Sequence, residues 1–525
     1  MMKRKDFLRN TISGVILPSF LNGIPLKSFA ENSPLARLLG GSADNDHVLV
    51  IVQLQGGNDG LNMVIPLDNY SNYYNARSNV AIDESQVLPL QGNTHTGLHP
   101  ALTGLKAMYD DGKLGIVQAV GYPQPNFSHF RATDIWMSGA ASDQVLLSGW
   151  GGRYLDYEFP NFPNGYPNSS MPDPLGIQIG SVTSLVFQGP STSMGMSISN
   201  PTSFYNLLNG VQDTAPNTLA GKELQFIREV AKQTTAYATV VKNAALKVTQ
   251  QSTYPSANPL GDQLKIVARL IKGGLKTKVY MVSYGSFDTH SLQTDSANHS
   301  IGRHADLLKI IGDAIKAFQD DLKYLNIEDR VMGITFSEFG RRIKSNSSAG
   351  TDHGAAAPLF IFGSNAIRMV HGNNPDIPVS ATVNDNIPMQ YDFRSVYASM
   401  LQDWLCVKQE DLQQIMLNNF QNIPLVNTSA CNTSIPNTSG KSLISNYPNP
   451  FNLDTNITFT TAGGHTLIQI LNTLGQLVAT PLDKVIPVAG TYNISWSSYK
   501  LSTGVYYARL QNGSIQQVKS MLKVQ

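Results

Sequence analysis

Short, continuous runs of hydrophobic residues recur before residue 424, and a cluster of polar residues follows each of them. Such runs, without polar alternation, suit strands that are buried on both faces, as in parallel sheets. Parallel α/β sheets bind their ligands at the carboxyl ends of the strands, so the polar clusters are expected to form one site. The runs are Val48–Leu54, Leu114–Val120, Val279–Tyr284 and Val331–Phe336; a fifth polar cluster, Gly350–Gly354, precedes the run Pro358–Gly363.

Stretches with helical periodicity separate these runs. The clearest is Ala305–Leu325, where apolar residues recur every three or four positions and charges occupy the other face. Residues 223–247, 260–271 and 393–405 also predict helices, whereas 159–196 predicts irregular loops forming a lid or rim. The alternation predicts a doubly wound, mostly parallel α/β sheet over residues 46–424.

The pattern changes after residue 424. Residues 425–441 repeat an Asn-Thr-Ser triplet and predict a flexible linker. Residues 442–525 contain short alternating segments separated by Gly-containing turns, which predict a small antiparallel, immunoglobulin-like sandwich.

Composition narrows the classes of function. The 525 residues include 38 Lys and Arg against 37 Asp and Glu, a net charge of +1, so nothing indicates nucleic-acid binding. No apolar run long enough for a transmembrane helix follows the N-terminus. Residues 1–30 predict an export signal, with basic Lys3–Arg9, apolar Ile12–Leu26 and small residues near Ala30. Arg4-Lys5 is similar to a twin-arginine motif with one lysine, which leaves the Sec and twin-arginine routes both open.

The chain has two cysteines, Cys406 and Cys431. They are able to pair in an oxidising compartment, but their spacing does not decide between a disulfide and two free thiols. Two cysteines are too few for a cysteine-rich structural zinc site.

The residues at the strand ends supply the ingredients of a metal centre. Carboxylates neutralise divalent ions, imidazoles suit zinc or manganese, and a hydroxyl beside a metal can act as a nucleophile. Taken singly, Asp59 also fits a turn, Ser128 a helix N-cap, and Glu338 an ion pair with a nearby arginine. The candidates are Asp59, Ser128, Asp288, His290, Glu338, Asp352 and His353.

Motifs across the body resemble the bacterial domain-of-unknown-function family 1501, which is related in fold to alkaline phosphatases and sulfatases. They are Gln55–Asn62, Leu98–Pro100, Ser128–Trp136, Ser148–Arg153, Phe287–His290, Ser337–Arg342 and Gly350–Gly354. The resemblance implies an alkaline-phosphatase-like fold with one or two ions (Zn, Mn, Mg or Ca). One ion would be held by Asp59, Ser128 and Glu338. The other would be held by Asp288, His290 and His353, with Asp352 as a ligand or a supporting partner.

The chain departs from the superfamily pattern in three respects. Glu338-Phe339-Gly340 stands where Asp-His-Gly is usual, so one imidazole is missing. Asp288 and His290 lie closer in sequence than is common. No Cys/Ser-X-Pro-X-Arg motif is present, which disfavours formylglycine-dependent sulfatase chemistry.

The C-terminal segment closely resembles the sorting domain of type IX secretion cargo. The resemblance lies in residues 447–451, 474–478, 501–507 and 519–524. It implies a Bacteroidetes-type outer membrane, passage through the periplasm and the type IX translocon, and a sortase partner. The product would be secreted or held on the outer-membrane surface.

Together these observations predict an exported, metal-dependent hydrolase of a phosphate-type or related anionic ester. Ser128 would be the nucleophile, His129 an acid or base, and Arg131 an anion-binding group, and the substrate would be an anionic small molecule or glycan. The alternative is a non-catalytic surface binding or adhesion protein that keeps the fold, because fold alone does not determine function.

Overall fold

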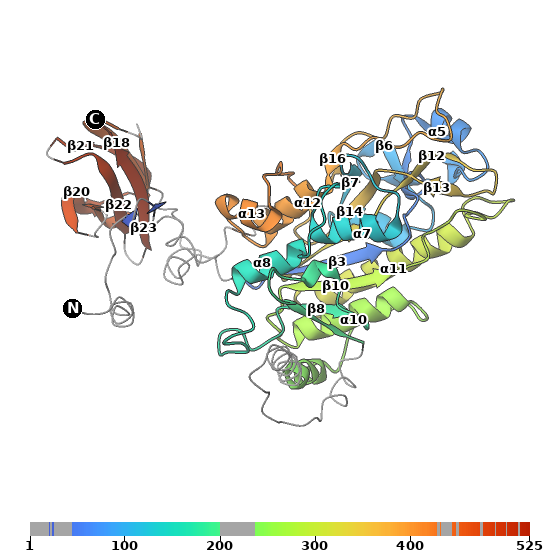
Figure 1. Cartoon of the computed structure of the whole chain (residues 1–525), viewed down its shortest axis with the longest axis horizontal. Helices are drawn as coiled ribbons and strands as arrows, with labels where there is room; N and C mark the ends of the chain where they lie inside the picture. The colour runs from blue at the N-terminus through green and yellow to red at the C-terminus, as the bar shows by residue number, and fades with distance from the viewer. Residues whose placement is uncertain are drawn as a thin grey trace. The chain divides into compact units, whose positions relative to one another are not determined.

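The computed structural model describes residues 45–199, 237–427, 431, 444–447 and 451–524, apart from short gaps in the last segment, together with residues 20–21 and 24–25. Contacts divide the chain into two units: residues 42–434 form the body, and the second contains residues 435–525 (Figure 1). The predicted export signal lies outside the described residues, except for β1 (Phe20–Leu21) and β2 (Ile24–Pro25), which pair antiparallel.

A nine-stranded mixed sheet forms the centre of the body. All its pairings are parallel except those of β14, which runs antiparallel to both β11 and β7. The four strands predicted from hydrophobic runs are confirmed, and the body is a mixed α/β unit. The strand order is β15 (Val370–His371), β7 (Leu114–Gly121), β14 (Ala357–Gly363), β11 (Val331–Phe336), β3 (Val48–Leu54), β10 (Val279–Tyr284), β8 (Gly176–Ile179) and β9 (Gly195–Ile198), with β16 (Tyr391–Asp392) also on β7.

The continuous apolar character of β3 reflects burial on both faces of the sheet. Every residue of β3 is buried. Val48, Val50 and Val52 pack into one core with α6, α10 and α11, whereas Leu49 and Ile51 pack into another with α7, α8 and α12. Helices therefore cover both faces of the sheet (Figure 1). Their bounds are α6 (Thr103–Asp110), α7 (His129–Ser138), α8 (Trp150–Glu158), α10 (Pro259–Lys272), α11 (Arg303–Tyr324) and α12 (Phe393–Ser399).

The remaining predictions for the body differ in detail. The helix predicted over residues 393–405 is interrupted, because α12 passes into a π-helix at Met400–Trp404 before α13 (Gln409–Met416). The segment 159–196 is more regular than predicted, since it contains β8 and the start of β9. Part of the predicted helix 223–247 lies outside the described residues, and residues 237–247 are helical.

Smaller elements complete the body. A three-stranded sheet contains β4, β6 and β5, and a separate two-stranded sheet joins β12 to β13. Cys406 and Cys431 form a disulfide bond, which decides the alternative that their spacing left open. The bounds are α4 (Gly60–Met63), α5 (Tyr70–Ala76), β4 (Val64–Pro66), β5 (Leu88–Leu90), β6 (Asn93–Leu98), β12 (Arg341–Ser345) and β13 (Thr351–His353).

The second unit is built from two antiparallel sheets, so the all-β prediction is confirmed; its immunoglobulin-like form stays a prediction. One sheet contains β17 (Ile444–Tyr447), β18 (Asp454–Thr461) and β21 (Gly490–Ser497). The other contains β20 (Leu477–Ile486), β19 (Gly464–Leu471), β22 (Gly504–Asn512) and β23 (Ile515–Lys523).

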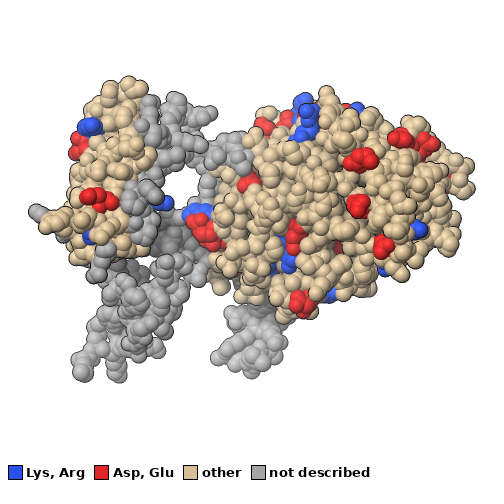
Figure 2. Space-filling model, turned by 90° about the horizontal axis from the view of Figure 1, so that it is seen from above, with Lys and Arg blue, Asp and Glu red and all other residues tan. Residues whose placement is uncertain are grey.

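Charge is sparse on the surface of the body. On the face shown in Figure 2, lysines, arginines and acids are scattered singly or in small groups, without a continuous basic patch. Among the described residues, none of the helices has the length and hydrophobicity to cross a membrane.

Candidate metal centre

Four elements bring polar side chains together at the carboxyl ends of the central strands. Asp288 and His290 follow β10, Glu338 follows β11, His353 ends β13, and His129 opens α7. The convergence that the sequence predicted at this edge therefore occurs for residues more than 200 positions apart, such as His129 and Glu338.

The Asp288 carboxylate lies at the centre of this cluster. His290 Nε2 is 3.1 Å and His353 Nε2 is 3.4 Å from Asp288 Oδ1, and His129 Nε2 is 3.6 Å from Asp288 Oδ2. His290 Nε2 and His353 Nε2 are only 2.9 Å apart. Three imidazole nitrogens thus face one carboxylate.

The other ring nitrogen of each histidine faces a hydrogen-bond acceptor. His129 Nδ1 lies 2.8 Å from Glu338 Oε1, and His290 Nδ1 lies 3.1 Å from Asp352 Oδ1. His353 Nδ1 lies 2.8 Å from the backbone carbonyl oxygen of Phe127. Because carboxylate and carbonyl oxygens only accept, each Nδ1 is assigned the proton, which leaves a lone pair on each neutral Nε2.

With these tautomers, the atoms that face one another at the centre are electron-rich and favour a bound cation. Three Nε2 lone pairs and a carboxylate repel one another unless protons or a metal ion lie between them. Histidine ligands of metals commonly donate their second N–H to a carboxylate or carbonyl, as all three do here. Ligand atoms of His129, Asp288 and His353 lie within 4.8 Å of one another, the spacing of groups able to hold one ion.

The donor set fits a transition metal. The two imidazoles and one carboxylate of this group, with His290 adjoining it at 2.9 Å from His353 Nε2, are nitrogen and oxygen ligands of the kind that zinc takes. Imidazole-rich sets also suit manganese, iron, copper and nickel, whereas calcium and magnesium prefer oxygen ligands. The residues present therefore fit one imidazole-preferring divalent ion.

Arg341 fixes the backbone around the centre. Its guanidinium is fully buried and donates 2.8 Å to Asp288 Oδ1. It also donates to the carbonyl oxygens of Gly56, Gly57, Phe287 and Thr351, and so ties three segments of the site together. Burial raises the pKa of the Asp288 carboxyl, but Arg341 and the nearby imidazoles outweigh it and hold that pKa below its usual value.

His353 is favoured in its neutral form. Burial lowers its pKa, and the positive charge of Arg341 adds to this effect, whereas the hydrogen bonds to Phe127 and Asp288 oppose it. A neutral imidazole is the form that coordinates a metal.

Asp59 takes a different place from the other candidates. Its buried carboxylate accepts two hydrogen bonds from Arg77 Nη1, at 2.8 and 2.7 Å, and one from Gln293 Nε2 at 2.6 Å. Burial raises its pKa, but the adjacent Arg77 outweighs this and lowers it. Gln293 Oε1 in turn accepts from the hydroxyls of Thr289 and Thr351. Through Gln293, Asp59 thus stabilises the residues next to Asp288, His290 and His353.

Glu338 and Asp352 contact the Nδ1 atoms of two histidines, on the side of each ring away from Asp288. Glu338 Oε1 accepts from the backbone N–H of Gly56 at 2.8 Å and pairs with His129 Nδ1. Asp352 Oδ1 accepts from Asn346 Nδ2 and pairs with His290 Nδ1. In this geometry they orient the histidines.

Ser128 and Arg131 occupy the start of α7. Ser128 is the exposed N-cap of this helix, between Phe127, whose carbonyl contacts His353, and His129. Arg131 donates to the backbone carbonyls of Ala141, Ser142 and Gln144, which anchors the following loop. The guanidinium predicted to bind an anion is thus engaged with backbone.

Two features of the site could not be singled out from the sequence. The grouping of His129 with Asp288 and His353 depends on α7 and β13 meeting in space. Arg77 lies in α5's C-terminal turn without any recognisable motif, and only its contact with Asp59 reveals its role.

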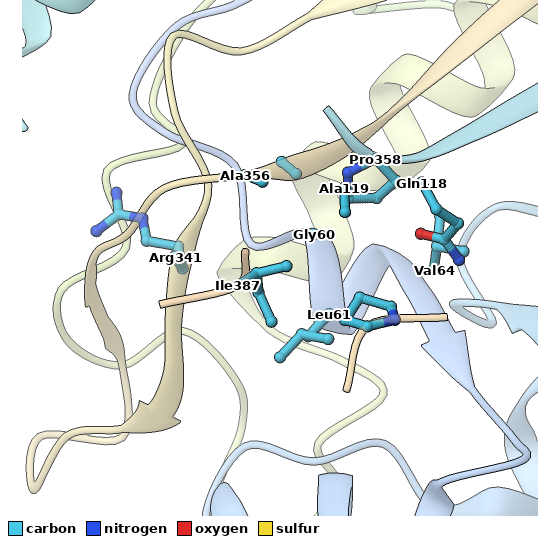
Figure 3. A pocket seen from close by; sticks show the side chains of 11 residues that line it. Gly60, Leu61, Val64, Gln118, Ala119, Arg341, Ala356, Pro358 and Ile387 are labelled. Atoms are coloured by element: carbon cyan, nitrogen blue, oxygen red, sulfur yellow. The ribbon is translucent and has the colours of Figure 1, made fainter. Parts of the chain in front are cut away.

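A cleft of about 550 Å³ opens beside the centre. Its lining includes His129, Asp288 and Glu338 from the centre, the end of β3 and one face of α7. A second cavity holds only about 10 Å³ and is lined mainly by small and aliphatic residues. The guanidinium of Arg341 points away from this cavity (Figure 3). The cavity is therefore mainly apolar, and its volume is too small for a substrate.

Comparisons with known proteins agree with both resemblances drawn from the motifs. Residues 213–403 match the family described as "Protein of unknown function (DUF1501)". Residues 445–524 match the family described as "Secretion system C-terminal sorting domain". Residues 213–403 are thus similar to that family, and the sorting domain indicates secretion or surface localisation through the type IX system. No curated protein sequence matches the chain.

Solved structures give weak likenesses. A PsFucS1 sulfatase from Pseudoalteromonas sp. is 11% identical with a TM-score of 0.34, over 90% of this chain and 88% of that one. An alkaline phosphatase from the Antarctic bacterium TAB5 is 11% identical with a TM-score of 0.26, over 61% of this chain and 94% of that one. The match to dimeric latent PorU from Porphyromonas gingivalis is 19% identical with a TM-score of 0.15, over 17% of this chain and 10% of that one. At these scores the likenesses carry no weight for the chemistry of the site.

Proposed function

We propose that the body is an exported, metal-dependent hydrolase that cleaves a phosphate-type or related anionic ester. The observation that carries this proposal is the set of three Nε2 atoms facing Asp288, each with its Nδ1 engaged by an acceptor. His129, Asp288, His290 and His353 would hold one ion, with zinc or manganese as the first candidates. A bound ion would supply Lewis-acid stabilisation of the negative charge that develops on the ester oxygens.

In this proposal the chain's own groups divide the remaining work. Glu338 and Asp352 keep the protons of His129 and His290 on Nδ1. Arg341 holds the Asp288 carboxylate in its ionised form. His129 is thereby assigned to ion binding rather than to proton transfer. Asp59 stabilises the floor of the site through Gln293 instead of reaching the ion.

Ser128 is the proposed nucleophile. It is exposed, and both neighbours in the chain touch the centre. Its position at the start of α7 adds free backbone N–H groups, which favour an anionic substrate. The Ser128 oxygen would attack phosphorus and displace the alcohol, which leaves with a proton; water would then release phosphate and restore the hydroxyl.

The finer architecture is part of the same proposal. Helices on both faces of a mostly parallel sheet, with the centre at its carboxyl edge, support an alkaline-phosphatase-like, doubly wound body. The sorting domain supports a translocon and a sortase as partners.

Metal analysis and kinetics of the purified chain test the proposal. We expect the protein to retain about one imidazole-preferring ion, and to hydrolyse 4-nitrophenyl phosphate, bis(4-nitrophenyl) phosphate or 4-nitrophenyl sulfate. Ser128→Ala should lower kcat by at least about a hundredfold while the metal content stays unchanged.

A double control separates the roles. His290→Ala should lower metal content and activity together, whereas Ser142→Ala, in the loop after α7, should change neither. A metal-loaded protein without turnover on any of the three esters would instead favour a non-catalytic binding protein. An ion-free protein that keeps its activity would disprove the metal centre.

A further inference from the structure

The cleft beside the metal centre has a composition of its own. Its volume of about 550 Å³ falls within the roughly 300–1,000 Å³ of sites for small molecules. It extends from the centre along α7 and across the ends of β3 and β10. The residues that line it away from the centre include Gln53, Gln55, Phe130, Thr133, Asp134 and Met137.

One face of α7 forms a wall of this cleft. Phe130, Thr133, Asp134 and Met137 are spaced by three, four and seven positions and so lie on the same side of the helix. Ile135 and Trp136, which point elsewhere, are buried in the core. The packing of α7 is therefore complete without Phe130, whose side chain is 88% exposed at the mouth of the site.

The charges in the cleft disfavour a second anionic group. The described residues that line it include Asp134, Asp288 and Glu338 but no lysine or arginine. The buried Arg341 guanidinium donates hydrogen bonds to Asp288 and to four backbone carbonyl oxygens. Arg131 donates to three backbone carbonyl oxygens. An anion at the metal would be compensated there, whereas a further phosphate or sulfate in the cleft would face the carboxylates of its lining, and Arg303, which reaches the lining residue Ser286, is engaged with its backbone oxygen.

The uncharged groups match the surface of a sugar. An exposed aromatic ring stacks on the apolar face of a pyranose, and amides, hydroxyls and carboxylates hydrogen-bond its hydroxyl groups. Gln53 and Gln55 are joined at 3.3 Å by a hydrogen bond from Gln55 Nε2 to Gln53 Oε1, and Thr133 and Asp134 lie beside Phe130 on α7. A quaternary ammonium group would need several aromatic faces around it, and among the described residues of this lining Phe130 is the single aromatic, apart from His129.

We propose that the cleft binds a neutral sugar as the alcohol part of the ester, with its ring against Phe130. This assignment rests on the proposed function for the position of the reacting group. The sugar contacts themselves depend only on the cleft.

Primary alkyl phosphates with and without a sugar test the specificity. We expect kcat/KM for glucose 6-phosphate, mannose 6-phosphate or galactose 6-phosphate to exceed that for ethyl phosphate. Phe130→Ala should lower kcat/KM for the sugar phosphates about fivefold, mainly through KM, because stacking contributes on the order of 1 kcal/mol. Leu147→Ala is the matched control, since Leu147 follows α7 in the chain and is 86% exposed but is not among the residues that line the cleft.

A binding measurement separates this inference from the reaction. Titration calorimetry of the full chain with maltohexaose, cellohexaose and mannohexaose should detect at least one ligand, and Phe130→Ala should weaken it while Leu147→Ala should not. Binding of this kind without hydrolysis would retain the sugar site and reject the hydrolase. Hydrolysis of ethyl phosphate and the three sugar phosphates at equal kcat/KM, without oligosaccharide binding, would reject the sugar site. Preference for phosphocholine or for glucose 1,6-bisphosphate would also overturn it.

Discussion

The supporting carboxylates decide how well the histidines of the centre bind an ion. Asp352 Oδ1 accepts the His290 Nδ1 proton, and an asparagine in its place would no longer supply that charge. We predict that Asp352→Asn lowers metal affinity about 10- to 100-fold, the usual effect of losing such a partner. Competition with a chromophoric chelator would measure it. Asp320→Asn, on the exposed face of α11, should leave affinity unchanged; equal losses in both variants would contradict the role of Asp352.

A second residue, His304, makes stability depend on pH. Burial lowers its pKa to about 4, so between pH 6.5 and 4 the unfolded chain binds a proton that the folded chain does not. The free energy of unfolding should therefore fall by about 3 kcal/mol as pH drops through this window. Urea unfolding at each pH would measure it. His304→Gln keeps a hydrogen-bond donor for Asn58 Oδ1. In this variant the slope of the unfolding free energy against pH should decrease by the equivalent of about one proton. An unchanged slope would show that His304 is not the group responsible.

The sequence reached many of these residues but not their roles. Asp288, His290 and His353 follow or end strands, so their convergence could be predicted from topology. Asp59 looked equivalent, yet a neutralising partner, Arg77, holds its carboxylate in the floor of the site. Side-chain pairing of this kind depends on packing between distant segments, which periodicity does not encode.

At the scale of elements, the turn after β3 determines how closely the segment that follows β10 packs against it. Gly56 has φ +123°, and a Cβ there would lie 2.5 Å from the backbone nitrogen of Asp288. We predict that Gly56→Ala displaces Asp288 and lowers both metal content and activity. Gly139→Ala, at φ +71° after α7, has no contact closer than 3.5 Å and should cost only about 1 kcal/mol of stability. Metal analysis and thermal unfolding of both variants would separate the two effects.

The elements themselves were more predictable than their directions. Buried runs such as β3 and β11 carry an unmistakable apolar pattern, and α11 carries helical spacing. The antiparallel direction of β14 is not encoded in its own residues, because β12 and β13 turn the chain back before it.

At the scale of the whole molecule, the two units have separate tasks. The body holds the centre and both cysteines, whereas the sorting match begins at residue 445. We predict that a chain ending at Ser434 keeps its metal affinity but is no longer carried across the outer membrane. Fractionation of cells and metal analysis of the truncated protein would test this. Loss of the metal on truncation would show that the second unit is required for the centre.

The Cys406–Cys431 bond has a mechanical consequence for a protein held at a cell surface. Tension applied through residues beyond Ser434 would reach the body at Cys431 and cross directly to Cys406, beside the π-helix. The 24 residues between the two cysteines, α13 among them, would bear none of this load. Shear flow on an attached molecule would therefore pull on the core of the body without peeling away its final helix.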